Sequence, residues 1–279
     1  MIFATFRLVF ILLFRFLGKL VFTFSKKRKN IAIKNLKLCF PDKNNKELNK
    51  ISKNSFILLG HSFADFFLVR FYKNKYFKKH FKVNGIDYLI KTLDEGKGVI
   101  LSAAHFGSFE LAAHFLALKG FKSLILYNPI KKNPRVEKFV KNNREYSGNK
   151  LISKHNSLVA VYRRLKKGGI VLFAADQNCY STEGIKVPLF SNNTFTHTGF
   201  INLSLKTGVP IVSGFIYTKN LFDYQIDVYL PLYPKDFVNL RNPEYEMTLA
   251  LNKILERAIK KSPAHWMWQH RRFKDLIKY

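Results

Sequence analysis

The sequence predicts an α/β protein with a mixed, largely parallel central sheet flanked by helices and an N-terminal hydrophobic membrane-anchor helix. Short runs of branched and aromatic residues alternate with helical patterns of about 10–15 residues, which is typical of strands joined by crossover helices. The first 24 residues are almost wholly apolar. A chain of 279 residues can bury the core of one domain of about 200–250 residues plus an appendage.

The apolar segment over residues 1–24 predicts the membrane anchor. Its length suffices for a span, which needs about 20 apolar residues, but the cations Arg7, Arg15 and Lys19 are costly at the centre of a bilayer. Their spacing lets all three lie on one helix face with their charged ends at the lipid headgroups, which favours an in-plane or tilted helix over a clean span. The alternative of a buried helix in a soluble protein is less favoured because these charges interrupt the run.

The sequence around the end of this segment indicates its orientation. No small-residue cleavage site follows it, which argues against a signal peptide that is removed. The basic cluster over residues 26–29 places the following part of the chain on the cytoplasmic side. We therefore expect an anchor over residues 1–25 and one folded domain over residues 26–279.

Beyond the anchor, helical and extended patterns alternate. Residues 46–72 form a long helical pattern with apolar residues on one side. Pro134 favours a helix start, and the glycines at 168, 169 and 208 favour helix ends. The other expected helices cover residues 86–95, 108–119, 134–144, 156–167, 197–207 and 244–261, and the expected strands cover residues 81–85, 98–103, 121–127, 170–174, 210–217 and 224–230.

A loop after the second expected strand carries the strongest functional signal. His105 lies there, and Glu110 follows five residues later in the first turns of the next helix. A histidine that takes a proton from an alcohol needs a partner to fix its tautomer and stabilise its cation, and Glu110 can do both. Asp176 follows the strand over 170–174, so it is expected at the same sheet edge as His105, where α/β proteins bind ligands.

The composition limits the kinds of partner that the protein can bind. The formal charge of +30 requires an anionic partner, for which nucleic acid, an anionic membrane leaflet, phosphorylated lipid and an acidic carrier protein are candidates. A generally lysine-rich surface accounts for part of the excess. The two cysteines, Cys39 and Cys179, are far apart and form no zinc-binding pattern or disulfide framework, which favours a reducing compartment. We expect no metal and no cofactor.

The spacing from His105 to Glu110 resembles the first motif of the glycerolipid acyltransferase superfamily. Its flanks, over residues 96–110, resemble the lipid A late (secondary) acyltransferase branch of that superfamily more specifically. Further matching segments occur in the same order along most of the chain. They are Asn30-Ile31, Asn35-Leu36, Cys39-Phe40-Pro41, residues 173–177, residues 187–190 and residues 266–274.

The resemblance implies an O-acyltransferase of the cell inner membrane, with a catalytic domain over residues 26–279 on the cytoplasmic side. It would move a fatty acyl chain to a hydroxyl of a lipid A precursor from acyl carrier protein or, less favoured, coenzyme A. His105 would remove the proton from that hydroxyl, and Glu110 would hold its ring. No covalent acyl-enzyme is expected, because the sequence lacks a Gly-x-Ser-x-Gly elbow.

Two further site residues follow from the resemblance. It implies a substrate-handling arginine near Arg144, although Arg135 competes for this role and either could be plain surface charge. It also suggests a substrate-binding role for Asp176, which could otherwise simply cap a loop.

The remaining candidates have structural alternatives. Arg271 and Arg272 are expected to be either phosphate binders or core-locking residues. His61 and Asp65, four residues apart on a helix, are expected to be structural, or at most part of the acceptor groove.

Two other functions remain open. One is an acyltransferase for another glycolipid or phospholipid acceptor, which would use the same residues. The other is a membrane-tethered nucleic-acid binder, which the charge and the 15% aromatic content permit. The chain contains no recognisable nucleic-acid-binding motif, so we expect no nucleic acid as partner.

Overall fold

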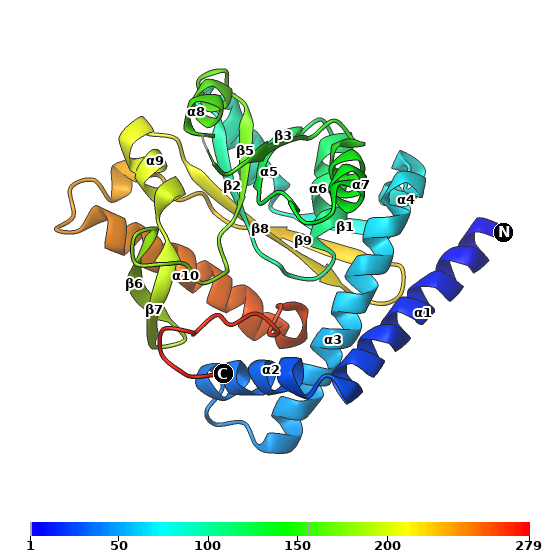
Figure 1. Ribbon diagram of the computed structural model, residues 1–279. Helices are drawn as coiled ribbons and strands as arrows, with labels where there is room; N and C mark the ends of the chain where they lie inside the picture. Colours follow the sequence, from blue (N-terminus) through cyan, green and yellow to red (C-terminus); the bar gives the residue numbers. More distant parts are fainter. Residues whose placement is uncertain (1, 156) are drawn as a thin grey trace.

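The computed structural model describes residues 2–155 and 157–279, and its centre is a seven-stranded sheet (Figure 1). The strands are β1 (Phe81–Asn84), β2 (Val99–Ala103), β3 (Ser123–Tyr127), β4 (Lys150–Ser153), β5 (Ile170–Ala174), β8 (Ile211–Thr218) and β9 (Tyr224–Val228), in the spatial order β1-β9-β8-β2-β5-β3-β4. The neighbours from β8 to β4 are parallel, whereas β9 runs antiparallel to β8 and pairs in parallel with β1. The predicted mixed, largely parallel sheet is confirmed.

Helices cover both faces of the sheet. Side chains of β2 alternate between the faces, so that Leu101 packs with one helical layer and Ile100 with the other. The first layer contains α5 (Ile86–Asp94) and α6 (Phe109–Leu118), with α7 (Pro134–Glu145) beside α6. The second contains α8 (Leu158–Lys166), α9 (Gly199–Thr207) and α10 (Pro243–Lys261). Because both faces are covered, the strands read as nearly continuous apolar runs.

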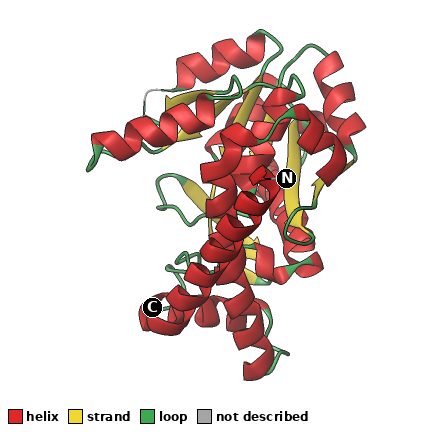
Figure 2. Ribbon diagram, turned by 90° about the vertical axis from the view of Figure 1, so that its right-hand side faces the viewer, coloured by secondary structure: helices red, strands yellow, loops and turns green. Residues whose placement is uncertain are grey.

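Helix α1 (Ile2–Phe24) lies along α3 (Asn45–Leu68), on the side of the molecule that faces the viewer in Figure 2. The two helices cross closely because each has a glycine at the contact. A Cβ atom on Gly18 would lie 2.3 Å from the carbonyl oxygen of Phe56, and one on Gly60 would lie 2.1 Å from that of Phe14. Any larger residue at either position would force the helices apart.

The cations of α1 do not share an outward face. Arg7 is 4% exposed, and its Nε donates to the hydroxyl of Tyr72 at 3.0 Å. Arg15 donates to Nδ1 of His61 at 3.2 Å, whereas Lys19 is exposed. The expectation that all three reach lipid headgroups is therefore wrong for Arg7 and Arg15, because polar groups of the folded domain bind them.

The outward face of α1 is mostly apolar, although Lys19 is exposed as well. The exposed large hydrophobic side chains of α1 are those of Phe6, Val9, Leu12, Leu13, Phe16, Leu17, Val21 and Phe24. Among the described residues, no single helix is long and apolar enough to cross a membrane. Only α1 and the following helix α2 (Lys26–Cys39) together have the required length and composition, and an 87° bend separates them.

The sequence pattern does not predict several of the observed helices and strands. They are α2, α4 (Asn74–His80), β4 and the antiparallel hairpin of β6 (Gly184–Leu189) and β7 (Asn192–His197). Short 3-10 helices also occur at Val69–Phe71, Pro234–Asp236 and Pro263–His265. Helix α2 and the hairpin both contact the C-terminal segment, and these long-range contacts stabilise them more than local propensity does.

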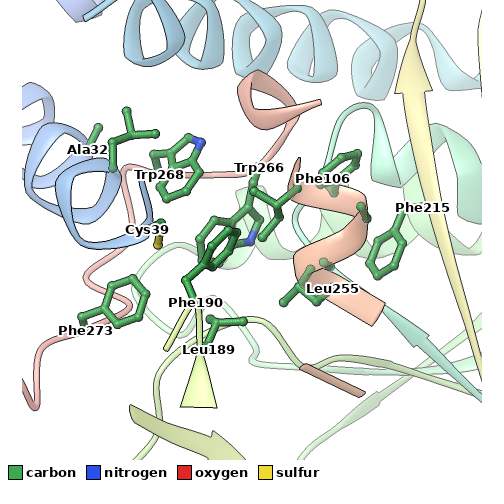
Figure 3. Packing of buried hydrophobic residues seen from close by; sticks show 14 of the residues in the cluster. Ala32, Cys39, Phe106, Leu189, Phe190, Phe215, Leu255, Trp266, Trp268 and Phe273 are labelled. Atoms are coloured by element: carbon green, nitrogen blue, oxygen red, sulfur yellow. The ribbon is translucent and has the colours of Figure 1, made fainter. Parts of the chain in front are cut away.

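The C-terminal segment returns to the carboxyl edge of the sheet and passes between α10 and α2 (Figure 1). Trp266 and Trp268 pack edge-to-face at 4.7 Å between ring centroids, in one buried cluster with Phe106 and Phe215 (Figure 3). The side-chain amide of Asn35 on α2 donates to the carbonyl of Trp268 at 2.8 Å. Through Phe106, this cluster packs against the loop that carries His105.

Candidate active site

The loop that carries His105 is clamped by the C-terminal segment. It begins directly after β2, and its Phe106 forms an isolated antiparallel bridge with Trp266. The amide of Gly107 donates to the carbonyl of His265 at 2.8 Å, and the amide of Met267 donates to the carbonyl of His105 at 3.1 Å. Gly107 has a φ of +55°, and a Cβ there would lie 2.3 Å from a backbone oxygen of β8, so this position requires glycine.

A buried aspartate orients the ring of His105. Oδ1 of Asp176 lies 2.9 Å from Nδ1 of His105, and Oδ2 accepts the backbone amide of His105 at 3.0 Å. Oδ2 also accepts the indole N–H of Trp266 at 2.9 Å. Because a carboxylate accepts hydrogen bonds, Nδ1 carries the proton in the neutral ring and Nε2 is left as the basic nitrogen. Asp176 can hold this geometry because β5, which precedes it, pairs directly with β2.

The charges of this pair reinforce each other. Burial alone would lower the pKa of His105, but the carboxylate of Asp176 outweighs burial, aided by Glu110, so that the pKa is raised above its ordinary value of 6.5. Burial likewise opposes the charge of Asp176, yet its bonds to His105 and Trp266 lower its pKa. An imidazolium at this position is therefore stabilised.

Glu110 does not hold the ring of His105. Its two carboxylate oxygens each lie 3.0 Å from Nε of Arg144, and one lies 2.5 Å from a terminal nitrogen of that guanidinium. The expected His105–Glu110 hydrogen bond is thus corrected to one with Asp176. The reason is that Glu110 lies on the first turn of α6 and faces α7, which carries Arg144. Arg135 lies exposed on α7, away from this pair.

A deep cavity of about 870 Å³ opens beside His105. Glu110, Arg144 and Gln177 line it near the carboxyl ends of the strands, whereas its inner part lies between the sheet and the helices α5 and α6. Ala112 and Ala113 on α6 are small and leave room there. The apolar lining of this inner part includes Leu89, Leu101, Leu116, Ile216, Ile226 and Val228.

The two C-terminal arginines differ in their surroundings. Arg272 is 1% exposed, and its guanidinium donates to the carbonyl of Phe195 at 2.7 Å and to the hydroxyl of Thr196 at 2.8 Å. It therefore locks the β6–β7 hairpin to the C-terminal segment, which agrees with the core-locking role, one of the two expected for Arg272, and not with phosphate binding. Arg271 is exposed, and its role in substrate binding stays a prediction.

Sequence reasoning missed the role of Trp266 as a donor to Asp176. The signal available was a tryptophan-rich segment in the expected family order, but nothing in it indicates which side chain it contacts. Within residues 2–155 and 157–279, no group of three or more His, Cys, Asp or Glu side chains has an arrangement that could hold a metal ion.

Comparisons with known proteins agree on one family. The family described as bacterial lipid A biosynthesis acyltransferase matches residues 3–275. The lipid A biosynthesis palmitoleoyltransferase of Escherichia coli K12 is 30% identical over 263 residues, which cover 92% of this chain and 82% of the relative. The lauroyltransferase of the same organism is 28% identical over 261 residues, covering 92% and 83%.

A solved structure shows a weaker likeness. The 1-acyl-sn-glycerophosphate acyltransferase of Thermotoga maritima aligns over 90% of this chain and 97% of its own, with 17% identity and a TM-score of 0.39.

Proposed function

The chain belongs to the bacterial lipid A biosynthesis acyltransferase family, and from this premise we propose that it moves a fatty acyl chain from acyl carrier protein to a hydroxyl of a lipid A precursor. Membership of the family implies acyl transfer in lipid A synthesis. The identity of the acyl donor, the roles of the site residues and the contact with the membrane are what we propose. The observation that carries it is the imidazole of His105, oriented by buried Asp176, beside a large apolar cavity.

His105 acts as the general base. Its Nε2 takes the proton of the acceptor hydroxyl as that oxygen attacks the thioester carbonyl, while Asp176 stabilises the imidazolium that forms. The C–O bond forms, the C–S bond breaks, and the imidazolium gives its proton to the departing thiolate. The nucleophile belongs to the substrate, so no acyl-enzyme is formed.

Arg144 and the start of α6 stabilise the developing oxyanion. The first backbone N–H groups of a helix point toward an anion placed at its N-terminus, and α6 begins four residues after His105. Arg144 adds a positive charge at the cavity, and its bidentate pairing with Glu110 holds the guanidinium in one orientation. Glu110 thus acts through Arg144, and through its charge on His105, rather than by holding the ring.

The inner cavity receives the acyl chain of the donor. An apolar slot of this size is suited to a hydrocarbon chain, and polar residues occur where the thioester and the acceptor hydroxyl would meet. The acceptor in turn comes from the membrane. The exposed apolar face of α1 continues through Phe14 to Phe67 on α3, at 5.5 Å between ring centroids, and from there to Phe139 on α7 at 5.7 Å.

This apolar strip leads toward the helix that carries Arg144, which supports docking of α1 in the plane of the cytoplasmic leaflet. The charge of +30 favours both an anionic leaflet and an acidic carrier protein. The basic residues 26–29, at the start of α2, follow α1 directly and supply part of this charge beside the docking face.

The test is acyl transfer by the purified protein in detergent micelles, followed by mass spectrometry of the lipid product. A lipid A precursor is offered with acyl carrier protein or coenzyme A thioesters at about 50 and 500 mM salt, where the Debye length falls from roughly 14 to 4 Å. We expect transfer from the carrier protein, with a KM that rises with salt and a kcat that changes little. A phospholipid acceptor and the His105→Ala variant serve as controls.

Two outcomes would contradict the proposal. If product forms on the phospholipid but not on the lipid A precursor, the acceptor is a phospholipid. If the enzyme prefers the coenzyme A thioester and its kinetics with the carrier protein do not depend on salt, coenzyme A is the donor.

A further inference from the structure

A buried polar cluster connects α1 with the catalytic loop, residues 104–108, which carries His105 and joins β2 to α6. At its centre the carboxylate of Asp65, on α3, is 0% exposed and accepts three hydroxyl groups. The hydroxyl of Tyr72 donates at 2.9 Å, that of Tyr224 at 2.8 Å, and that of Ser108 at 2.5 Å. Such a buried carboxylate requires this degree of hydrogen bonding, so its partners are held tightly.

Ser108 has an unusual bonding pattern for its position. It is the N-cap residue of α6, where a serine side chain usually accepts an amide of the first turn, yet it makes no capping hydrogen bond. Its hydroxyl instead donates to Asp65 on another helix. Asp65 therefore binds the residue at which α6 begins, and the side chain of Ser108 does not occupy the amides of the first turn.

The position of this turn matters for the reaction. Ser108 lies between His105 and Glu110, so movement of Ser108 shifts both the base and the partner of Arg144. Misplacement of a reacting group by about 1 Å can cost roughly 100-fold in rate. A group that holds Ser108 is thus able to act on the chemistry without touching substrate.

Arg7 supplies the positive charge beside Asp65. Its guanidinium bonds Tyr72 and Tyr76 and lies 3.5 Å from the hydroxyl of Tyr224, and it attracts Asp65 electrostatically. Two of the three hydroxyl groups that bind Asp65 therefore also bind α1. The inward face of this helix is part of the same hydrogen-bonded unit as Ser108.

We propose that Asp65, together with Arg7, positions the catalytic loop through Ser108, so that the seating of α1 controls turnover in addition to membrane contact. This inference rests on the acyl transfer proposed above. Asp65, Arg7 and Ser108 are positioning residues, since none of them touches the reacting atoms.

The experiment separates positioning from simple stability. Ser108→Ala removes one hydroxyl, and Ser204→Ala is its matched control, because Ser204 is equally buried, donates to a carbonyl at 2.5 Å and does not line the cavity. Kinetics in detergent micelles give kcat and KM, and amide hydrogen exchange followed by mass spectrometry gives the opening of residues 106–112. Exchange needs no substrate, so it remains readable even if the proposed acceptor or donor is wrong.

We expect Ser108→Ala to lower kcat roughly 10- to 100-fold, to leave both KM values within about twofold, and to speed exchange over residues 106–112. Ser204→Ala should leave kcat, both KM values and amide exchange over residues 106–112 unchanged. Arg7→Met should lower kcat in the same way, whereas Lys19→Met, which removes an exposed cation from the same helix, should not.

If Ser108→Ala keeps the wild-type kcat and the wild-type amide exchange over residues 106–112, Asp65 does not position the catalytic loop. Wild-type kcat in folded Arg7→Met would overturn the control by α1. If Arg7→Met does not fold, Arg7→Lys, which keeps the charge but has fewer donors, takes its place with the same expectation and the same criterion.

Discussion

The indole N–H of Trp266 donates to Oδ2 of Asp176 at 2.9 Å, while Oδ1 of the same carboxylate lies 2.9 Å from Nδ1 of His105. One buried side chain thereby joins the C-terminal segment to the catalytic loop. The orientation of the base depends on both contacts.

His105→Ala should reduce acyl transfer by roughly 10²- to 10⁴-fold, because the general base is lost. His155→Ala is a suitable control, since His155 is exposed and lies outside the cavity. Initial rates of product formation at saturating donor measure the effect. Turnover near the wild-type level in purified His105→Ala would contradict the mechanism.

The acid limb of the kcat/KM profile should report a pKa above the ordinary histidine value of 6.5, because the free enzyme is inactive while His105 is protonated. Asp176→Asn removes the carboxylate that raises this pKa. We expect the acid limb of Asp176→Asn to move to lower pH, even though its maximal rate falls. Trp266→Phe removes a donor that competes for Asp176 and should move the limb the opposite way. An unshifted limb in Asp176→Asn would show that another group titrates.

Glu110→Ala and Arg144→Ala should both be severely impaired, by roughly 100-fold, since each removes a charge from the cavity. If Glu110 acts mainly through Arg144, the double variant should be little worse than either single variant. The measurement is a double-mutant cycle on kcat/KM. Additive losses would assign Glu110 a role that is independent of Arg144.

Gly214→Leu should shift the donor preference toward shorter acyl chains. Gly214 lines the cavity, and a Cβ built on it meets nothing closer than 3.9 Å, so the new side chain can enter the slot. Each methylene displaced from an apolar pocket costs about 1–3 kcal/mol of discrimination. Competition among donors of different length, read by mass spectrometry, should show a graded effect with Gly214→Ala in between. An unchanged preference would place the acyl chain elsewhere.

Serine substitutions at Leu12, Leu13 and Phe16 should weaken binding to anionic vesicles by about 1 kcal/mol per side chain, because these residues are roughly half exposed on the outward face of α1. Serine at Leu158 and Val159 on α8 and at Leu230 in the loop after β9, all of which are exposed, is the control. Vesicle sedimentation at low and high salt measures the change. Equal losses in both triple variants would mean that α1 is not the docking face.

The sheet edge that holds the site was predictable, whereas the contacts across it were not. Apolar runs ending at Ala103 and Ala174 indicated that His105 and Asp176 lie at the carboxyl ends of strands. That β5 pairs with β2, and so brings Asp176 within hydrogen-bond distance of His105, depends on strand order, which no local pattern encodes. Nearness in sequence predicts that Glu110 contacts His105, but the position of Glu110 on α6 turns its carboxylate toward Arg144.

The N-terminal helix illustrates the same limit. Periodicity correctly indicated that Arg7 and Arg15 share a face, because that follows from helix geometry alone. It could not indicate what that face contacts. The hydroxyl groups of Tyr72 and Tyr76 and the ring of His61 come from elsewhere in the chain, and they bind charges that the sequence suggested would face lipid headgroups.

The bridge between Phe106 and Trp266 also determines when the site can form during folding. A chain synthesised only as far as residue 262 contains the cavity walls, His105 and Asp176, but it lacks the backbone clamp on the loop and the indole donor. Contacts between residues so distant in sequence form late, because the loop they close must be ordered first. Partly folded chains should therefore pack the two helical layers against the sheet before they acquire the ability to consume acyl donors.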